Sequence, residues 1–130
     1  MLRQEYRGFV AANGLQFYVE RAGEGPTLLY ISGTGGDLRN KPNQLDSPLA
    51  KHFNLVCFDQ RGLGQSAKPA VEYAMADYAD DAAALLDQVT DAPVRVIGVS
   101  CGGMVAQELA LRYPEKSRSP LLVCTSAGGG

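Results

Sequence analysis

The sequence predicts an α/β fold, with an N-terminal β-hairpin followed by a mostly parallel sheet that carries helices on both faces. Two observations support this prediction. Short, continuously apolar runs, typical of strands buried on both faces, recur four times along the 130 residues. Segments between these runs place apolar residues at helical spacing, and such alternation favours a parallel sheet with right-handed crossovers.

The first half of the chain supplies the hairpin and two strands. Residues 8–21 contain two β-type runs joined by Asn13-Gly14, the strongest short hairpin signal in a sequence. The apolar runs "TLLYISG" and "NLVCFD", residues 27–33 and 54–59, are the first two buried strands. A long loop rich in Gly, Pro, Asn and Asp separates them and leads into a short helical stretch around "PLAKHF".

The second half of the chain alternates helix and strand. Residues 75–89 place their apolar side chains on one helical face. Residues 94–100, "VRVIGVS", form a third buried strand, and a helix over 101–112 follows at once until Pro114 stops it. The run "PLLVCTS", residues 120–126, is a fourth strand.

The bulk composition indicates an ordinary soluble domain. The chain is 45% hydrophobic and 20% charged, and we take residues 1–130 as a single domain. A formal charge of −2, with scattered lysines and arginines, predicts no nucleic-acid partner. No apolar stretch approaches the length of about 18 residues that a membrane helix requires, so no membrane partner is expected.

The cysteines and aspartates predict neither disulfides nor a metal site. The three cysteines form no C-x-x-C pair, and we interpret Cys57 and Cys124 as small buried hydrophobes. Together with the absence of a signal-peptide core in the first residues, this predicts a cytoplasmic location. No second ligand set converges on the acidic residues of the first helix, which we interpret as a solvated face: Asp77, Asp80 and Asp81.

The pentapeptide Gly98-Val99-Ser100-Cys101-Gly102 matches G-x-S-x-G between a predicted strand and a predicted helix. A sharp strand-to-helix turn forces the serine into a strained backbone conformation, and the flanking glycines leave room for it. Ser100 would then project above the carboxyl edge of the sheet, where open α/β folds bind ligands. The backbone N–H of Cys101, at the start of the helix, is the natural first donor to an oxyanion.

Two other interpretations of this stretch stay open. Ser100 could be an ordinary helix N-cap in a glycine-rich turn. The stretch could also cradle a phosphate, although the lysine of a P-loop is absent and the spacing does not fit. The interpretation that we carry forward is a nucleophilic serine.

Several segments, in order along the chain, resemble the α/β-hydrolase family in its small-molecule esterase- and lactonase-like branch. They are "LLYISGTGGD", "FDQRGLGQSAKP", "YAMADYADDAAALLDQV", "VIGVSCGGMVAQELALRYPEK" and "LLVCTSAGG". In the second segment, Asp59 and Arg61 resemble the structural turn of the family. The resemblance implies that Asp59 holds loops together and is not half of an acid–base pair.

The resemblance also implies an activity and a set of site residues. The intact protein would cleave an ester, lactone or related acyl bond of a small-molecule substrate, with Ser100 as nucleophile and without a cofactor. The second oxyanion donor would be the backbone N–H of Thr34, which follows the pair Ser32-Gly33 where the family usually has His-Gly. Ser32 and Gly33 are further candidates for substrate contacts, because glycine loops let a backbone approach a ligand closely.

The groups that would activate Ser100 are not found after it. In this fold the acid and then the histidine follow the serine, yet only Glu108 and Glu115 follow here, in or just beyond the helix that Ser100 opens. The single histidine, His52, precedes a strand and so belongs to the far edge of the sheet. We therefore expect the N-terminal half of a hydrolase, a natural fragment or a shortened protein, with the C-terminal strands and lid missing and no activity by itself.

Two alternative functions remain open at this point. One is a non-catalytic module of hydrolase fold that binds a small ligand, and the other is a non-functional fragment. The oligomeric state is not predicted, except that residues 120–126 would form an apolar, unprotected edge strand. Such edges pair with other chains, so we expect self-association.

Overall fold

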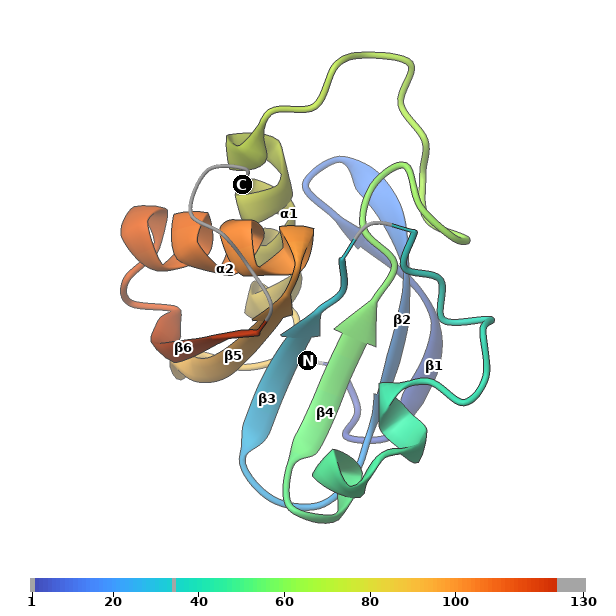
Figure 1. The fold of residues 1–130 in the computed structure, drawn as a ribbon, viewed down its shortest axis with the longest axis vertical. Helices are drawn as coiled ribbons and strands as arrows, with labels where there is room; N and C mark the ends of the chain where they lie inside the picture. Colours follow the sequence, from blue (N-terminus) through green and yellow to red (C-terminus); the bar gives the residue numbers. More distant parts are fainter. Residues whose placement is uncertain (1, 34, 124–130) are drawn as a thin grey trace.

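The computed structural model describes residues 2–33 and 35–123, which form one mixed six-stranded sheet with helices against it (Figure 1). The strand order across the sheet is β1-β2-β4-β3-β5-β6. The strands are β1 (Tyr6–Ala12), β2 (Leu15–Ala22), β3 (Thr27–Ile31), β4 (Asn54–Phe58), β5 (Val94–Val99) and β6 (Ser117–Val123). The helices are the α-helices α1 (Met75–Asp87) and α2 (Cys101–Arg112) and the short 3-10 helices η1 (Gln44–Asp46) and η2 (Pro48–Lys51).

The predicted hairpin forms at the antiparallel margin of the sheet. Asn13 and Gly14 both adopt positive φ angles, 50° and 75°, which is the backbone that a tight type I′ turn needs. β1 and β2 pair antiparallel through this turn, and β2 pairs antiparallel with β4. The hairpin therefore forms the antiparallel part of the sheet, with β1 as its edge strand, and the other strands run parallel.

The strands β4, β3, β5 and β6 pair parallel in that order, as the buried apolar runs predict. β3 lies between two parallel partners, since Leu29 is opposite Val56 on β4 and opposite Val96 on β5. The carboxyl ends of parallel strands meet at one edge of a sheet, which is where ligands bind in open α/β folds. The loops that follow β3, β4 and β5 therefore start side by side at that edge.

Helices cover both faces of the sheet, as predicted, but in different ways. α1 and α2 pack against each other and against the apolar side chains of β1 to β5, and they enclose the larger core (Figure 1). On the opposite face, Leu28, Leu55 and Cys57 pack beneath η1 and η2. That helical segment stays short because the side chains of Asn43 and Ser47 each cap a new turn.

The last strand and the cysteines agree with the sequence in most respects. β6 begins at Ser117, three residues before the predicted strand, and it pairs only with β5 among the described strands. Residues 124–126 of the predicted strand, Cys124 among them, lie outside the described residues. Cys57 is buried as predicted, and burial raises the pKa of its thiol to about 12.

The position of Asp81 contradicts the solvated face expected for α1. Its buried carboxylate accepts hydrogen bonds from Arg61 Nε (2.6 Å) and Nη2 (2.8 Å) and from Asn13 Nδ2 (2.8 Å). Helical periodicity separates apolar from polar positions, but it does not reveal that a cation reaches this position from a distant loop. Asp80, by contrast, is partly exposed and pairs with Arg112.

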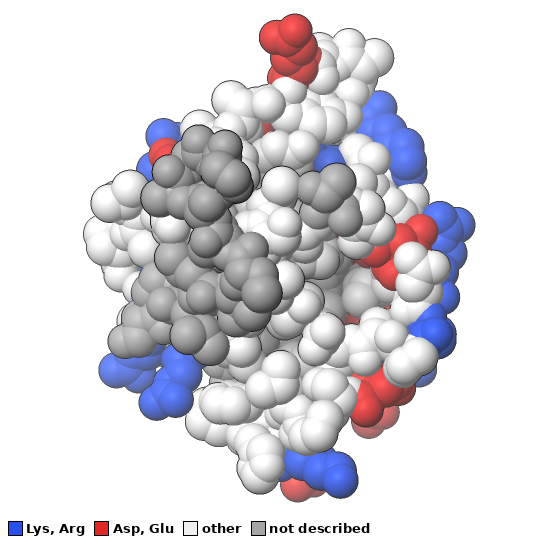
Figure 2. Space-filling view, in the orientation of Figure 1, with Lys and Arg blue, Asp and Glu red and all other residues white. Residues whose placement is uncertain are grey.

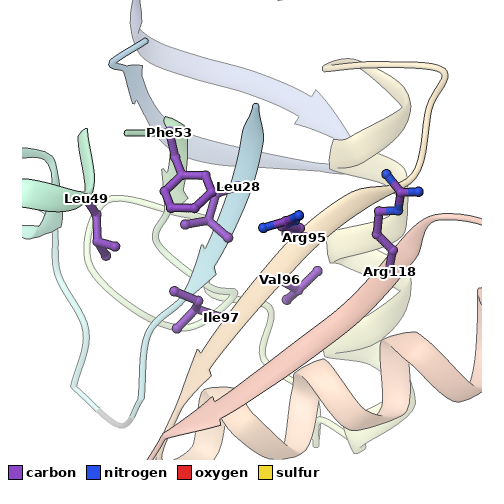
Figure 3. A pocket seen from close by; sticks show the side chains of 7 residues that line it. All are labelled: Leu28, Leu49, Phe53, Arg95, Val96, Ile97 and Arg118. Atoms are coloured by element: carbon purple, nitrogen blue, oxygen red, sulfur yellow. The ribbon is translucent and has the colours of Figure 1, made fainter. Parts of the chain in front are cut away.

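A cavity of about 660 Å³ opens on the sheet face opposite the two α-helices (Figure 3). Apolar side chains form most of its lining, and Arg95 and Arg118 flank it from β5 and β6 (Figure 3). Its lining consists of strand residues together with Leu49 of η2 and Phe53 just before β4, and none of them directly follows the carboxyl end of β3, β4 or β5. This cavity is therefore separate from the edge at which the site is expected.

The surface carries no dominant charge on the face seen in Figure 2. Acidic and basic side chains alternate along its right-hand edge, and much of the remaining described surface is uncharged. This mixture agrees with the formal charge of −2. Within the described ranges, no helix is long and apolar enough to cross a membrane.

Candidate active site

Ser100 lies at a sharp turn between β5 and α2. Its backbone angles are φ 56° and ψ −122°, and apart from Asn13 it is the only described non-glycine residue with a positive φ. A side chain in this region costs of order 1–3 kcal/mol, so the surrounding structure must hold it there. The turn presents the exposed Ser100 at the carboxyl edge of the sheet.

Glycines on either side of Ser100 let the helix approach the sheet closely enough to impose this turn. A Cβ added at Gly98 would overlap the backbone of Gly102 and Gly103 in the first turn of α2. A Cβ added at Gly102 would overlap the carbonyl oxygens at the end of β3. The first turn of α2 therefore packs directly on the backbone of β5 and β3, which explains why the motif needs glycine two positions before and two after the serine.

Helix capping does not account for a serine at this position. Ser100 occupies the N-cap position of α2, but its side chain makes no capping hydrogen bond, and its carbonyl oxygen accepts the N–H of Gly103 (2.9 Å). Its backbone also lies far from the extended conformation that capping residues usually adopt. The N-cap interpretation therefore fails on geometry.

The loop after β3 lies against Ser100. A Cβ added at Gly33 would be 2.9 Å from both Ser100 Cβ and Val99 O, and 3.5 Å from Ser100 Oγ. Gly36 N donates to Gly33 O (3.1 Å), which folds the loop back on itself. Thr34, the predicted second oxyanion donor, lies outside the described residues.

Cys101 and Ser32 are the neighbours in sequence of Ser100 and Gly33. Cys101 begins α2, so its backbone N–H lies at the positive end of the helix dipole, where negative charge is favoured. Ser32 precedes Gly33, and its carbonyl oxygen accepts a hydrogen bond from Gln60 Nε2 (2.9 Å). The structure thus brings together Ser32, Gly33, Ser100 and Cys101 of the predicted site residues.

The loop after β4 ties the edge together through Asp59. Its buried carboxylate accepts the N–H groups of Leu38 (2.8 Å) and Gln65 (3.0 Å), one in the loop after β3 and one in its own loop. Burial raises the pKa of this carboxyl against the effect of the two hydrogen bonds. Arg61 pairs with Asp81 and not with Asp59. The predicted loop-holding role of Asp59 is therefore confirmed.

A cavity of about 200 Å³ opens beside the serine turn. Its lining comes from the loops after β3 and β4 and from both α-helices: Gly33, Gln60, Leu63, Met75, Tyr78, Cys101 and Val105. The sequence does not single out Gln60, Met75 or Tyr78, because their shared surroundings arise only once β3, β4 and β5 pair. The one available signal is that Gln60 closely follows the carboxyl end of a predicted strand.

The histidine and the glutamates lie away from Ser100, as the sequence predicts. His52 is exposed and caps η2 just before β4, at the amino end of the strands. Glu108 lies in the second half of α2, roughly 12 Å along the axis from Ser100 by the helical rise. Glu115 is exposed beyond the end of that helix. The described residues therefore place no imidazole beside the serine.

The parallel strands β5 and β3 end, respectively, in a strained serine turn and in a glycine loop that lies against it. This arrangement indicates the class of α/β protein to which the chain belongs. The profile of the family described as alpha/beta hydrolase fold matches residues 26–128. The chain therefore belongs to the α/β-hydrolase family.

Known proteins of this family give the scale of the similarity. The hydrolase YraK of Bacillus subtilis, itself uncharacterised, is 32% identical over 111 residues, which are 84% of this chain and 41% of YraK. The solved structure of Est816, an N-acyl homoserine lactone degrading enzyme, matches with a TM-score of 0.78 and 27% identity, over 90% of this chain and 45% of that one. The solved structure of a membrane phospholipase A, a bacterial virulence factor, matches with a TM-score of 0.82 and 28% identity, over 93% of this chain and 40% of that one. The chain spans about two fifths of the length of the curated relatives that it matches.

Proposed function

We propose that the full-length protein, meaning this chain together with the segment that supplies an acid and a histidine, is a serine hydrolase acting on acyl bonds. The observation that carries the proposal is the strained backbone of Ser100 at the carboxyl edge, with Gly33 directly against it. Strain of this kind persists where a side chain must be presented in one direction. Two relatives named for lactone degradation and phospholipid cleavage support an ester or lactone as the bond that is cleaved.

The reaction would proceed in two balanced steps. Ser100 Oγ bonds to the substrate carbonyl carbon, the bond to the leaving oxygen breaks, and the histidine passes the hydroxyl proton to the leaving alcohol. Water then attacks the acyl-serine, releases the carboxylic acid and returns a proton to Ser100. The backbone N–H groups of Cys101 and Thr34 would hold the negative charge that develops on the carbonyl oxygen in each step.

The 130-residue chain by itself would lack turnover under this proposal. A serine hydroxyl at its ordinary pKa is a weak nucleophile without an adjacent base. His52, the one histidine of the sequence, lies at the amino-end edge of the parallel strands, opposite the edge that carries Ser100. The chain therefore supplies the nucleophile and oxyanion donors, and the remaining groups come from outside it.

A fluorophosphonate probe tests the assignment of the nucleophile. We expect the full-length protein to be labelled at Ser100, as located by peptide mass spectrometry, and the Ser100→Ala variant to remain unlabelled. The 130-residue chain should show only background labelling. A full-length protein that binds small ligands but leaves Ser100 unlabelled would instead be a binding module of hydrolase fold.

A further inference from the structure

Gln60 has one hydrogen-bonding atom that the described residues do not satisfy. Its side chain is buried, with 3% of its surface exposed. Nε2 donates to Ser32 O (2.9 Å), whereas Oε1 has no hydrogen-bond partner among residues 2–33 and 35–123. Buried acceptors without a partner are rare and cost free energy, so this oxygen requires an explanation.

The orientation of the amide follows from its neighbour. A carbonyl oxygen such as Ser32 O can only accept a hydrogen bond, so it selects the NH₂ end of the Gln60 amide. Turning the amide over would place two acceptors against each other and leave the NH₂ group without Ser32. The atom that remains for a ligand is therefore the acceptor Oε1.

Gln60 also lines the cavity of about 200 Å³ beside Ser100. Gly33 and Cys101 form the wall nearest the serine turn, and Leu63 and Val105 belong to the apolar remainder. At roughly 30 Å³ for each water molecule in the liquid, this space corresponds to about six or seven water-sized groups. The cavity thus combines a small apolar volume with the Gln60 amide in its lining.

The side of the cavity formed by Tyr78 is supported by a second layer of side chains. Its ring packs edge-to-face on Tyr73, with 5.9 Å between the centroids, and the guanidinium of Arg61 lies 5.5 Å from the centre of the Tyr73 ring. Arg61 is in turn fixed by its buried pair with Asp81. A wall built in this way keeps its shape, so the cavity can discriminate between ligands by size.

We propose that this cavity is the acyl subsite, and that it selects a short acyl chain carrying a hydroxyl or N–H group whose hydrogen Gln60 Oε1 accepts. The inference rests on the proposed hydrolase function. The acyl chain is bonded directly to the carbonyl carbon that Ser100 would attack, and the cavity begins at Gly33 and Cys101, which flank that point. Gln60 is then a specificity-determining residue that also supports the loop after β3 through Ser32.

Pairs of p-nitrophenyl esters that differ by a hydroxyl in place of a methyl group test the subsite in the full-length protein. The pairs are 3-hydroxybutanoate with 3-methylbutanoate and 6-hydroxyhexanoate with heptanoate. We expect kcat/KM to favour the hydroxy ester of at least one pair by about tenfold, because only it satisfies the buried oxygen. In Gln60→Met, which keeps the side-chain length, this ratio should fall to about one.

Three further measurements separate this role from support of the loop. Gln60→Glu keeps an acceptor oxygen but cannot donate to Ser32 as an anion, so the rates should fall for both esters while the preference for the hydroxy ester remains. Gln88→Met is the matched control, since the Gln88 amide also donates to a backbone carbonyl (Ala11 O, 2.8 Å) but lines neither the 200 Å³ nor the 660 Å³ cavity. This variant should leave the ratio of the two kcat/KM values unchanged. Val105→Leu narrows the cavity and should penalise the longer chains relative to acetate.

Two results would overturn the subsite while leaving the hydrolase proposal intact. One is a protein that labels at Ser100 and cleaves esters, yet shows a ratio near one or the same ratio in Gln60→Met. The other is a hydroxyl preference that follows the leaving alcohol and not the acyl chain. Absence of labelling at Ser100 would instead refute the hydrolase proposal itself.

Discussion

Ser100 is held in a backbone conformation that its own side chain disfavours. β5 ends at Val99 and α2 begins at Cys101, so the positive φ falls on the single residue between them. Gly98 and Gly102 make the turn sterically possible, but they do not relieve the serine itself. The conformation therefore stores strain that a glycine in place of Ser100 would release.

Replacing Ser100 by glycine should stabilise the protein. We expect Ser100→Gly to unfold with a free energy about 1 kcal/mol higher than Ser100→Ala, because glycine adopts a positive φ without strain and alanine does not. The gain is reduced by the larger conformational freedom of glycine in the unfolded chain. Urea unfolding of the two variants, both without Oγ, measures this difference. A less stable glycine variant would contradict the strain argument.

Predictability differs sharply between the residues of the site. Ser100 and its glycines could be found from sequence because their constraint is local, a strand and a helix joined without room for side chains. Gln60 could not, because its importance comes from a carbonyl oxygen on another loop and from a cavity walled by four segments. Local backbone chemistry is readable in one sequence, whereas convergence of distant segments is not.

The same contrast appears at the scale of elements. The hairpin, the buried strands and both α-helices could be predicted, since turn residues and apolar periodicity determine them locally. The burial of Asp81 could not, because Asn13 and Arg61 reach it from the hairpin turn and from the loop after β4. This carboxylate therefore joins three elements that are far apart in the sequence.

Removing Arg61 should cost much more stability than removing Arg112. Both arginines pair with an aspartate of α1, but the Arg61 side chain is 10% exposed and that of Arg112 is 41% exposed. Arg61→Ala leaves Asp81 as a buried charge and should lower the free energy of unfolding by about 3–5 kcal/mol. Arg112→Ala, the matched control, should lower it far less, because water screens this exposed pair. Equal losses of unfolding free energy in the two variants, measured by urea unfolding, would show that the buried pair stabilises the fold no more than the exposed pair.

The six-stranded sheet has one edge formed by β1, the outer strand of the hairpin, and the other formed by β6. β6 pairs with β5 and with no other described strand, so its outer backbone groups face away from the sheet. Unpaired edges of this kind add strands from other chains. We therefore expect this edge to affect how the 130-residue chain behaves in solution.

We expect the 130-residue chain to self-associate. Light scattering coupled to size-exclusion chromatography should give a mass above that of the monomer, 13.8 kDa. The fraction of associated chains should rise with protein concentration. The full-length protein, in which further strands would cover β6, should remain monodisperse at the same concentrations. A monomeric 130-residue chain at high concentration would rule out the open edge as a source of association.

Because β3 lies between β4 and β5 in the sheet, its position affects the order in which the protein folds during synthesis on the ribosome. β3 is made before both of its parallel neighbours, and β5 follows it only after about 60 further residues. At roughly 5–20 residues per second, the nascent strand waits several seconds with an open side. The arrival of β5 ends that wait and, in the same event, brings the serine turn against the glycine loop, so the geometry of the proposed site forms late and in a single step.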